Sequence, residues 1–287
     1  MKNESRTKKI KALFSQLALY KYDGVLIHQE HDNEGAIEVV EVDGVRSLHF
    51  GTVPRQSSML ISDPNRLYLE YARTMSSWLL FKETLNHQEA LLIGLGGGSI
   101  AKHLLYQFPD CKVNVVEYRK SVLKVARTHF GLPIDSRLNV VIDDGANYVK
   151  KNREKDAKRY SIIAIDAFDH EGMAEAICNI EFFTHCQTLL KSDGILAINL
   201  WGGVHRPQFQ KIALWLGKLF NWKLLFVPVK GRGNIIGLAF NPKTPVYSLK
   251  DLRTRAIVLE HLHQIEYTYY LKDLVKHNAS VLKNVIY

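Results

Sequence analysis

Short apolar runs alternate with helix-forming segments along most of this chain, and this alternation constrains its fold more than any other feature. Each run is followed by a segment whose apolar residues recur at helical spacing. The runs begin at Ala90, Val113, Leu138, Ile162 and Ile195. Strands that alternate with helices need crossover connections, and these place the strands parallel to one another. Two further runs, 223–229 and 235–240, extend the pattern, so we expect a doubly wound, mostly parallel α/β sheet of about seven strands.

A different pattern precedes this region and predicts a small antiparallel β-domain. Three short runs contain apolar residues that partly alternate with polar ones: 25–27, 36–42 and 47–50. Asp43-Gly44 separates the last two, and Asp-Gly between such runs is a strong hairpin signal. Ahead of them, residues 5–20 place apolar side chains on one side of a helix and lysines on the other, which predicts an amphipathic helical arm.

These patterns predict two domains. We expect residues 1–65 to form the helical arm and the β-domain, and residues 66–287 to form the larger α/β domain. The α/β domain would begin with a helix over 66–85, where the apolar periodicity is helical. It would end in a helical tail over 249–284.

The composition is that of an ordinary globular protein, with 46% hydrophobic and 23% charged residues. The formal charge of +9 invites a polyanionic partner. However, the densest basic stretch, 150–159, interleaves acidic residues and lacks aromatic side chains. Such mixed stretches are typical of solvated helix ends, so nucleic acid is not an expected partner.

We expect no membrane span, no secretory leader and no metal site. No apolar run approaches the roughly 20 residues that a membrane helix needs, and the first residues lack a signal-peptide core. The cysteines Cys111, Cys178 and Cys186 have no CxxC spacing, and the histidines form no HExxH motif. The expected location is the cytoplasm, where the cysteines would be reduced.

Glycines and an acid at the ends of the first two predicted strands indicate a nucleoside site. Gly94, Gly96, Gly97 and Gly98 follow the first strand and open its helix. Glycines there let the backbone approach a ligand, and the free N–H groups favour its polar atoms. Glu117 ends the second strand about 20 residues later, where a carboxylate would bind two ribose hydroxyls.

The third predicted strand ends in a further acidic turn that fits the same site. Asp144, followed by Gly145, would accept a hydrogen bond from an adenine amino group. The carboxyl ends of neighbouring parallel strands share one edge of the sheet, so these groups would surround one cleft. The alternative is that Glu117 and Asp144 are helix N-caps or solvated loop acids.

Two stretches farther along carry a resemblance to a known family. Residues 181–196 read EFFTHCQTLLKSDGIL and match the block EFFxxCxxxLKxDGIL nearly residue for residue. Asp166 and Asp169, with Gly172, match a DxxD pattern after the fourth strand. On these motifs, residues 90–200 resemble the spermidine synthase (polyamine aminopropyltransferase) family. The resemblance implies a class I methyltransferase-like Rossmann fold with a small N-terminal β-domain.

The resemblance implies an enzyme that moves an aminopropyl group from decarboxylated S-adenosylmethionine to an amine, without a metal. A primary amine has a pKa of about 10 and arrives protonated, so a base must remove a proton before the nitrogen attacks. By resemblance, Asp166 is this base, Asp169 positions the amine, and Tyr71 belongs to a gatekeeping segment. Gln56 and Asn199 match the family's glutamine and amide positions. Spacing alone leaves an alternative, in which Asp166 caps the next helix and Asp169 is solvated.

The sequence also departs from the family pattern. Gly97 stands where the family has an aspartate that would grip the amino end of the donor. The absence of this charge leaves the choice between decarboxylated and ordinary S-adenosylmethionine open. The other departures are Ala72 and Arg73 for a His-Glu pair, Trp201 for an acid, and Lys230 and Arg232 in the segment near the polyamine. Cations that point into that pocket would repel a diamine.

Three functions therefore stay open at the level of sequence. The first is an aminopropyltransferase that acts on a small-molecule amine such as a polyamine. The second is an S-adenosylmethionine-dependent methyltransferase whose anionic substrate suits the basic residues. The third is a catalytically inactive relative that binds a nucleoside. The resemblance and the edges of the predicted β-domain also imply a homodimer.

Overall fold

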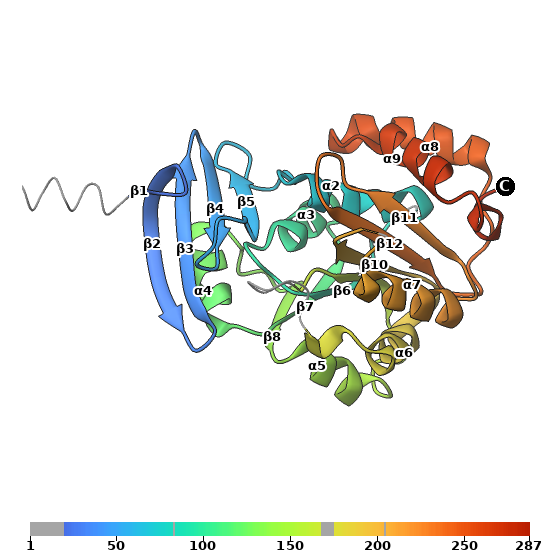
Figure 1. Cartoon of the computed structure of the whole chain (residues 1–287), viewed down its shortest axis with the longest axis horizontal. Helices are drawn as coiled ribbons and strands as arrows, with labels where there is room; N and C mark the ends of the chain where they lie inside the picture. The colour runs from blue at the N-terminus through green and yellow to red at the C-terminus, as the bar shows by residue number, and fades with distance from the viewer. Residues whose placement is uncertain (1–19, 83, 168–174, 204) are drawn as a thin grey trace, which may run out of the picture.

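The computed structural model contains two β-sheets, of which the smaller lies at one end of the molecule (Figure 1). The structure describes residues 20–82, 84–167, 175–203 and 205–287. The smaller sheet is antiparallel, with strands β1 (Tyr20–Lys21), β2 (Gly24–Asp32), β3 (Gly35–Val42), β4 (Val45–His49) and β5 (Ser57–Leu60) in this order. Asp43 and Gly44 have φ values of 48° and 75° and form the predicted turn between β3 and β4. The helical arm predicted over 5–20 lies outside the described residues, except for Tyr20, which begins β1.

The larger sheet has seven strands in the order β11-β12-β10-β9-β6-β7-β8. Its strands are β6 (Glu89–Ile93), β7 (Lys112–Glu117), β8 (Leu138–Ile142), β9 (Tyr160–Ile165), β10 (Leu190–Trp201), β11 (Leu224–Pro228) and β12 (Asn234–Phe240). Strands β6 to β10 pair in parallel, and β12 is antiparallel to both of its neighbours. The predicted mostly parallel α/β sheet and the separate antiparallel sheet are therefore both confirmed.

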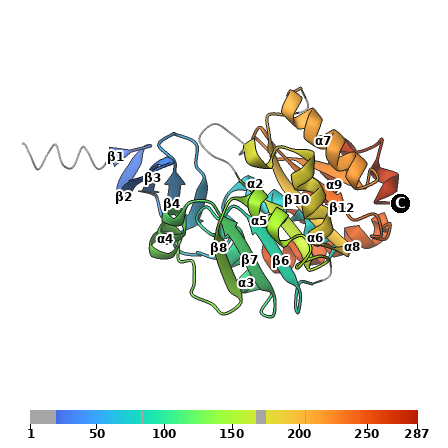
Figure 2. The ribbon, with the colours of Figure 1, turned by 90° about the horizontal axis from the view of Figure 1, so that it is seen from below.

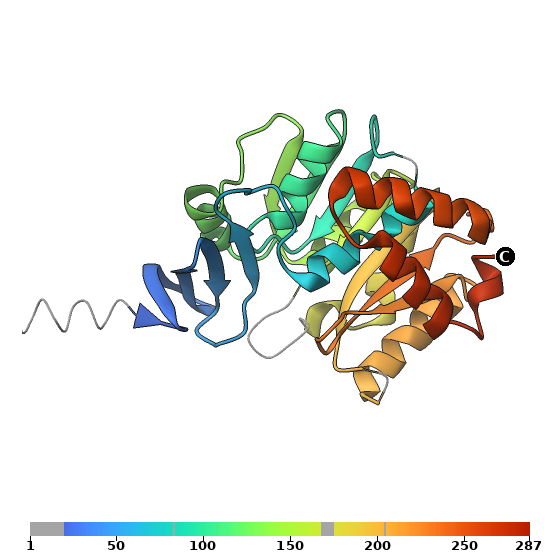
Figure 3. The ribbon, with the colours of Figure 1, turned by 90° about the horizontal axis from the view of Figure 1, so that it is seen from above.

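Helices cover both faces of the larger sheet. The bounds are α2 (Glu70–Met75), α3 (Ser99–Gln107), α4 (Lys120–His129), α5 (Gly145–Asn152), α6 (Ile180–Leu189), α7 (Pro207–Leu219), α8 (Leu249–His263) and α9 (Tyr267–His277), with 3-10 helices η1 (Ser76–Phe81), η2 (Glu175–Ile177) and η3 (Leu282–Asn284). Helices α5, α6 and α7 lie on one face (Figure 2), and α3, α8 and α9 lie on the other (Figure 3). No described helix combines the length and the apolar character needed to cross a membrane.

Strand β9 illustrates why the sheet needs helices on both faces. Its residues are all buried, and they alternate between two separate cores. Ile162 and Ala164 pack with the core beneath α3, α8 and α9, whereas Ile163 and Ile165 pack with the core beneath α5, α6 and α7. A strand that is buried on both faces reads as a continuous apolar run, because successive side chains point to opposite faces.

The helix predicted over 66–85 is shorter than expected. The α-helix begins at Glu70 and ends at Met75, and residues 76–81 form a 3-10 helix that is buried throughout. The Ser76 hydroxyl donates to the Arg73 carbonyl at 2.6 Å and competes with the backbone for this acceptor. Serine side chains of this kind favour the end of an α-helix, so the apolar periodicity alone overestimated its length.

The two sheets are joined by a small core and by buried polar contacts. Val122 and Val125 of α4 pack against side chains of the smaller sheet. Arg119 holds Asp32 of β2 with N···O distances of 3.1 and 2.7 Å. Lys102 of α3, only 2% exposed, donates to the carbonyl oxygens of Pro64 at 2.7 Å and of Phe130 at 2.6 Å. The predicted division at residue 65 is not itself tested by these contacts and stays a prediction.

The buried Lys102 predicts a specific pH dependence of stability. Burial lowers the pKa of Lys102 from 10.5 to about 8. Between these values the unfolded chain binds a proton that the folded protein has released, so the free energy of unfolding rises with pH in this window. We expect a rise of roughly 2–3 kcal/mol from this residue, measured by urea unfolding between about pH 8 and pH 10.5.

The variant Lys102→Met should lose this part of the pH dependence. The exposed Lys120 at the start of α4 offers a matched control, and Lys120→Met should keep the slope of the unsubstituted protein. Equal slopes for both variants would contradict a lowered pKa at Lys102.

Candidate active site

A cavity of about 590 Å³ lies where the carboxyl ends of the central strands face the chain segment before β5. Most of the residues predicted from the sequence line it: Gln56, Tyr71, Gly94, Gly96, Glu117, Asp144, Gly145, Asp166 and Asn199. They come from both sheets and from positions far apart in the chain. Open α/β sheets bind ligands in such a crevice at the carboxyl ends of their strands.

Gly94 brings the ends of β6 and β9 into close contact. Its φ is +95°, and a Cβ added there would lie 2.1 Å from the Asp166 carbonyl oxygen. The backbone N–H of Gly94 donates to Val116 at 2.9 Å, and that of Asp166 donates to Ile93 at 2.8 Å. Only glycine fits this geometry, and the result is that Asp166 lies beside the glycine-rich turn.

Gly94→Ala should therefore destabilise the protein more than the same substitution at a glycine that has a similar φ but no atoms near its Cβ position. Gly35, with φ of +105° and nothing within 4 Å of its Cβ position, provides this control. A positive φ costs an alanine roughly 1–2 kcal/mol, and overlap with backbone adds about 1–3 kcal/mol. Urea unfolding should show the first cost in Gly35→Ala and both costs in Gly94→Ala. Equal losses would mean that the Gly94 turn relaxes away from Asp166.

Gly97 and Gly98 are not among the residues that line the cavity, and their predicted part in cofactor binding stays a prediction. A Cβ at Gly97 would lie 2.9 Å from the Phe130 ring, and one at Gly98 would lie 2.8 Å from Leu132. Gly98 also has φ of +76° and precedes α3 as its N-cap. Both glycines are thus needed for packing beneath the turn, whereas Gly94 and Gly96 face the cavity.

Glu117 is a buried carboxylate with two backbone partners. One of its oxygens accepts from the Leu95 N–H at 2.9 Å, and the other accepts from the Arg119 N–H at 2.8 Å. Burial raises the pKa of Glu117, and these two bonds oppose the rise. Each carboxylate oxygen can accept a further hydrogen bond, so both remain available to hydroxyl donors in the cavity.

Asp144 serves as a helix N-cap and also lines the cavity. Its Oδ1 accepts from the Asn147 N–H at 2.9 Å, which caps α5 as the alternative interpretation expected. The neighbouring Asp143 accepts from the Asp144 N–H at 2.9 Å and from Lys151 at 3.1 Å. The N-cap uses only one carboxylate oxygen of Asp144, and Asp144 also lines the cavity. The two interpretations of Asp144 are therefore compatible.

Asp166 follows β9 directly and is held by an amide network. The Asn199 Nδ2 donates to its Oδ1 at 2.9 Å, and the Asn234 Nδ2 donates to the Asn199 oxygen at 2.9 Å. Asn234 begins β12 and is paired across the sheet with Trp201, so the antiparallel register brings the two amides together. The network fixes the orientation of the carboxylate toward the cavity.

Tyr71 completes the surroundings of Asp166. Burial raises the pKa of Asp166 above its ordinary value of 3.8, and the hydrogen bond from Asn199 opposes this rise. Burial and the negative charge of Asp166 raise the pKa of the Tyr71 phenol, which keeps its proton and donates to the Gln56 carbonyl oxygen at 3.2 Å. The site thus offers one carboxylate with increased basicity beside a neutral hydrogen-bond donor.

Asp169, predicted to position the amine, lies outside the described residues. Asn234 and Arg55 line the cavity but were not predicted from the sequence. Asn234 immediately precedes the predicted strand 235–240, but this position becomes informative only with the register of β12 against β10. Within the described part of the chain, no group of three or more His, Cys, Asp or Glu residues could hold a metal ion.

Comparisons with known proteins agree with this geometry. The model of the spermine/spermidine synthase domain matches residues 70–201. A polyamine aminopropyltransferase of Neisseria meningitidis is 32% identical over 245 residues, which cover 85% of this chain and 90% of that protein. One of Chromobacterium violaceum is 33% identical over 252 residues, covering 87% and 93%. The chain belongs to the spermidine synthase family.

Solved structures of family members share the fold. A probable spermidine synthase from Corynebacterium glutamicum has a TM-score of 0.68 at 18% identity and covers 80% of this chain and 86% of its own. A spermidine synthase in complex with the transition state analogue AdoDATO has a TM-score of 0.64 at 18% identity, covering 89% and 85%. The predicted family and fold are therefore both confirmed.

The departures from the family pattern occupy different places in the structure. Gly97, where the family has an aspartate, faces Phe130 and Ser57, so a longer side chain would need this packing to change. Trp201 lines the cavity and is 47% exposed. Lys230 lies 5.7 Å from the Tyr269 ring centroid and faces α9, whereas Arg232 lines a second cavity beside the first.

Proposed function

We propose that this protein transfers an aminopropyl group from decarboxylated S-adenosylmethionine to a primary amine. The observation that carries the proposal is the position of Asp166. It directly follows β9 and lines the same cavity as Glu117 and Asp144, and the Asn199 Nδ2 donates to its Oδ1 at 2.9 Å. A base of raised pKa beside a nucleoside-sized cleft is suited to remove a proton from an incoming ammonium group.

The residues proposed to bind decarboxylated S-adenosylmethionine have carboxylate oxygens that can accept further hydrogen bonds. Glu117 would accept the two ribose hydroxyls, because each of its oxygens keeps a free lone pair. Asp144, with Gly145 behind it, would accept from the adenine amino group. Gly94 and Gly96 allow the backbone to approach the donor closely, and Gln56 lies on the opposite wall.

The proposed reaction is a displacement at carbon. Asp166 takes one proton from the acceptor ammonium, which frees the lone pair of the nitrogen. This lone pair attacks the aminopropyl carbon bonded to the sulfonium sulfur, so that an N–C bond forms as the C–S bond breaks. The electron pair of the broken bond goes to sulfur, and methylthioadenosine leaves as a neutral thioether. Asn199, which donates to Asp166 Oδ1 at 2.9 Å, would keep the carboxylate oriented throughout.

The test uses purified full-length protein, decarboxylated S-adenosylmethionine and a panel of primary amines with cationic, neutral and anionic tails. We expect methylthioadenosine to form together with an acceptor whose mass has increased by one aminopropyl group. Absence of methylthioadenosine with every amine would refute the proposal. Formation of S-adenosylhomocysteine from ordinary S-adenosylmethionine would instead support the methyltransferase alternative.

The proposal includes three further features of the protein: its domain boundary, its location and its oligomeric state. We propose a division into domains at residues 65 and 66, a cytoplasmic location and a homodimer. The dimer is supported by the edges of the smaller sheet, since β1 and β5 each pair with one strand only. Light scattering on the eluting protein would give the molar mass, and a monomer at micromolar concentration would contradict the dimer.

A further inference from the structure

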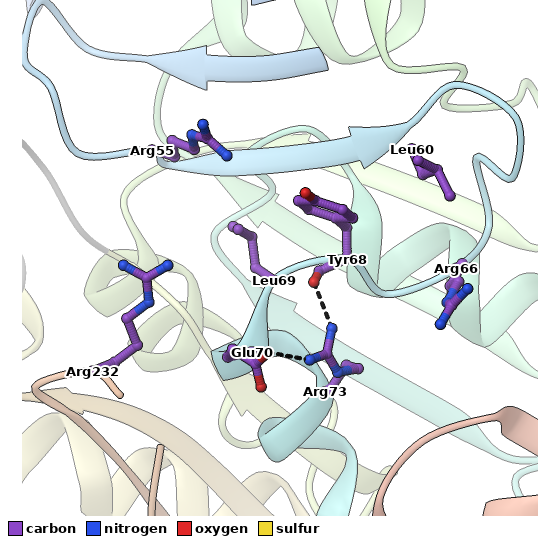
Figure 4. A pocket seen from close by; sticks show the side chains of 8 residues that line it. All are labelled: Arg55, Leu60, Arg66, Tyr68, Leu69, Glu70, Arg73 and Arg232. Atoms are coloured by element: carbon purple, nitrogen blue, oxygen red, sulfur yellow. Dashed lines mark hydrogen bonds and ion pairs between the residues drawn. The ribbon is translucent and has the colours of Figure 1, made fainter. Parts of the chain in front are cut away.

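A second cavity, of about 350 Å³, lies next to the candidate active site and is rich in arginine (Figure 4). Its lining residues are Arg55, Leu60, Arg66, Tyr68, Leu69, Glu70, Arg73 and Arg232. They come from three separate parts of the chain: the segment around β5, the segment leading into α2, and the turn between β11 and β12. Four guanidinium groups in one cavity of this size make it a site of strongly positive potential.

Only one of these four arginines is compensated by carboxylates. Arg73 forms ion pairs with Glu70 and with Glu266, the latter at 3.2 Å, and it donates to the Tyr68 carbonyl at 2.6 Å. Arg55, Arg66 and Arg232 form no ion pair with any other residue that the structure describes. The cavity therefore carries an excess of positive charge, because its single lining carboxylate, Glu70, is already engaged by Arg73.

The second cavity adjoins the first cavity near Tyr71 and Asn234. Arg55 lines both cavities. Glu70 immediately precedes Tyr71, and Arg232 lies two residues before Asn234 of the network that holds Asp166. Glu117 and Asp144, which define the nucleoside end, do not line the second cavity. An acceptor whose nitrogen lies at Asp166 would thus extend its tail toward these arginines.

We propose, on the basis of the proposed function, that the acceptor amine carries a carboxylate or a phosphate at the end remote from the attacking nitrogen. Arg55 and Arg232, which lie on the same side of the cavity in Figure 4, would bind this anionic group, and Arg66 on the opposite side would add to the positive potential. Guanidinium groups bind both anions through charge-assisted, bidentate hydrogen bonds. A simple diamine would instead bring a second ammonium group toward the uncompensated guanidinium groups of Arg55 and Arg232, which disfavours it. The anionic group takes no part in bond making, and the nitrogen proton still goes to Asp166.

A matched series of acceptors tests this inference. Putrescine, butylamine, δ-aminovalerate and aminobutyl phosphate share a four-carbon chain and differ only in the group at its far end. The readout is kcat/KM for methylthioadenosine release from decarboxylated S-adenosylmethionine. We expect one of the two anionic amines to exceed putrescine by at least about tenfold, and this advantage to shrink as salt is raised. The better of the two anions identifies the carboxylate or the phosphate as the natural group.

Substitution of the cavity arginines tests whether they cause the preference for an anionic amine over putrescine. Arg232→Gln and Arg55→Gln should each lower the ratio of kcat/KM for the anionic amine over kcat/KM for putrescine by about tenfold. Arg127→Gln, at an exposed arginine in the last turn of α4, is the matched control and should keep the ratio. A ratio is used because a merely structural effect would lower both values together.

The outcomes separate this inference from the proposed function. Methylthioadenosine release that is fastest with putrescine, and a ratio that Arg232→Gln does not move, would overturn the anionic acceptor and leave aminopropyl transfer standing. No release with any amine would overturn both. A preference for ordinary S-adenosylmethionine over its decarboxylated form, lost in Arg55→Gln, would assign the arginines to the donor carboxylate and would also overturn the inference.

Discussion

Asp166→Asn is expected to lower kcat for aminopropyl transfer by about 100-fold to 10,000-fold, the usual contribution of a positioned general base. Asparagine has nearly the shape of aspartate, and one amide oxygen can still accept from Asn199, which donates at 2.9 Å. What it lacks is the capacity to take a proton from an ammonium group. The measurement is the initial rate of methylthioadenosine release at saturating donor and acceptor.

Binding of the donor should be preserved in this variant, because Glu117 ends β7 and Asp144 comes just after β8, and these strands lie beyond β6 from Asp166 and β9. Calorimetric titration with methylthioadenosine should therefore give a dissociation constant within about threefold of the unsubstituted protein. Asp251→Asn, at an exposed aspartate in the first turn of α8, controls for nonspecific effects of removing a carboxylate. A turnover rate that survives in Asp166→Asn would remove the assignment of the base.

The same substitution should stabilise the protein at neutral pH. Burial raises the pKa of Asp166, so the folded protein binds this proton more tightly than the unfolded chain does. The free energy of unfolding therefore falls as pH rises from the ordinary value of 3.8 through the raised pKa. Asparagine has no such dependence, and its advantage should be present at pH 7 and disappear toward acid pH. At pH 7 we expect the melting temperature to rise by about 2–4 °C for each kcal/mol that the substitution adds to the free energy of unfolding.

Much of the fold was predictable because each central strand is buried on both faces. A strand such as β9 reads as a continuous apolar run, and the helices between such runs leave a parallel sheet as the simplest arrangement. The end of α2 was not predictable from periodicity. There the hydroxyl of Ser76 and the tight packing of 76–81 select a 3-10 helix, although the apolar residues keep their helical spacing.

The candidate site was predictable where one strand end supplies one functional residue. Glu117 ends β7, and Asp144 and Asp166 come just after β8 and β9, so all three lie at one edge of the sheet. Contacts that depend on the antiparallel part of the sheet were not predictable. Asn234 reaches Asn199 only because β12 returns beside β10 in a register that the sequence does not specify.

The arginine cavity shows the same limit in another form. The sequence indicates Arg232 as a cation that could repel a diamine, whereas Arg55 and Arg66 are isolated cations in loops and match no motif. Three-dimensional proximity converts them into a cluster. Gly97 and Gly98 fit the glycine-rich motif, and the structure adds that they pack against Phe130 and Leu132, which the sequence did not indicate.

Glu117→Gln should weaken binding of the nucleoside strongly, because the carboxylate has two functions that an amide cannot combine. Its two oxygens accept from the backbone N–H groups of Leu95 and Arg119, and each oxygen has a lone pair left for a ribose hydroxyl. Glutamine replaces one oxygen with an NH2 group. This group would face a backbone N–H donor, and the hydrogen bond that the replaced oxygen accepted from a ribose hydroxyl would be lost. Hydrogen bonds to a charged group contribute roughly 1.5–3 kcal/mol each, so we expect an affinity loss of about 100-fold or more.

The ligand pair of methylthioadenosine and free adenine separates the ribose contacts from a distortion of the turn. Both contain the base that Asp144 would bind, but only methylthioadenosine carries the hydroxyls. If Glu117 binds ribose, calorimetry should show a large loss for methylthioadenosine and a loss of less than about fivefold for adenine. Similar losses for both ligands would mean that Glu117 acts by holding Leu95 and the glycine-rich turn in place. In that case the ribose hydroxyls would need another partner on the cavity wall.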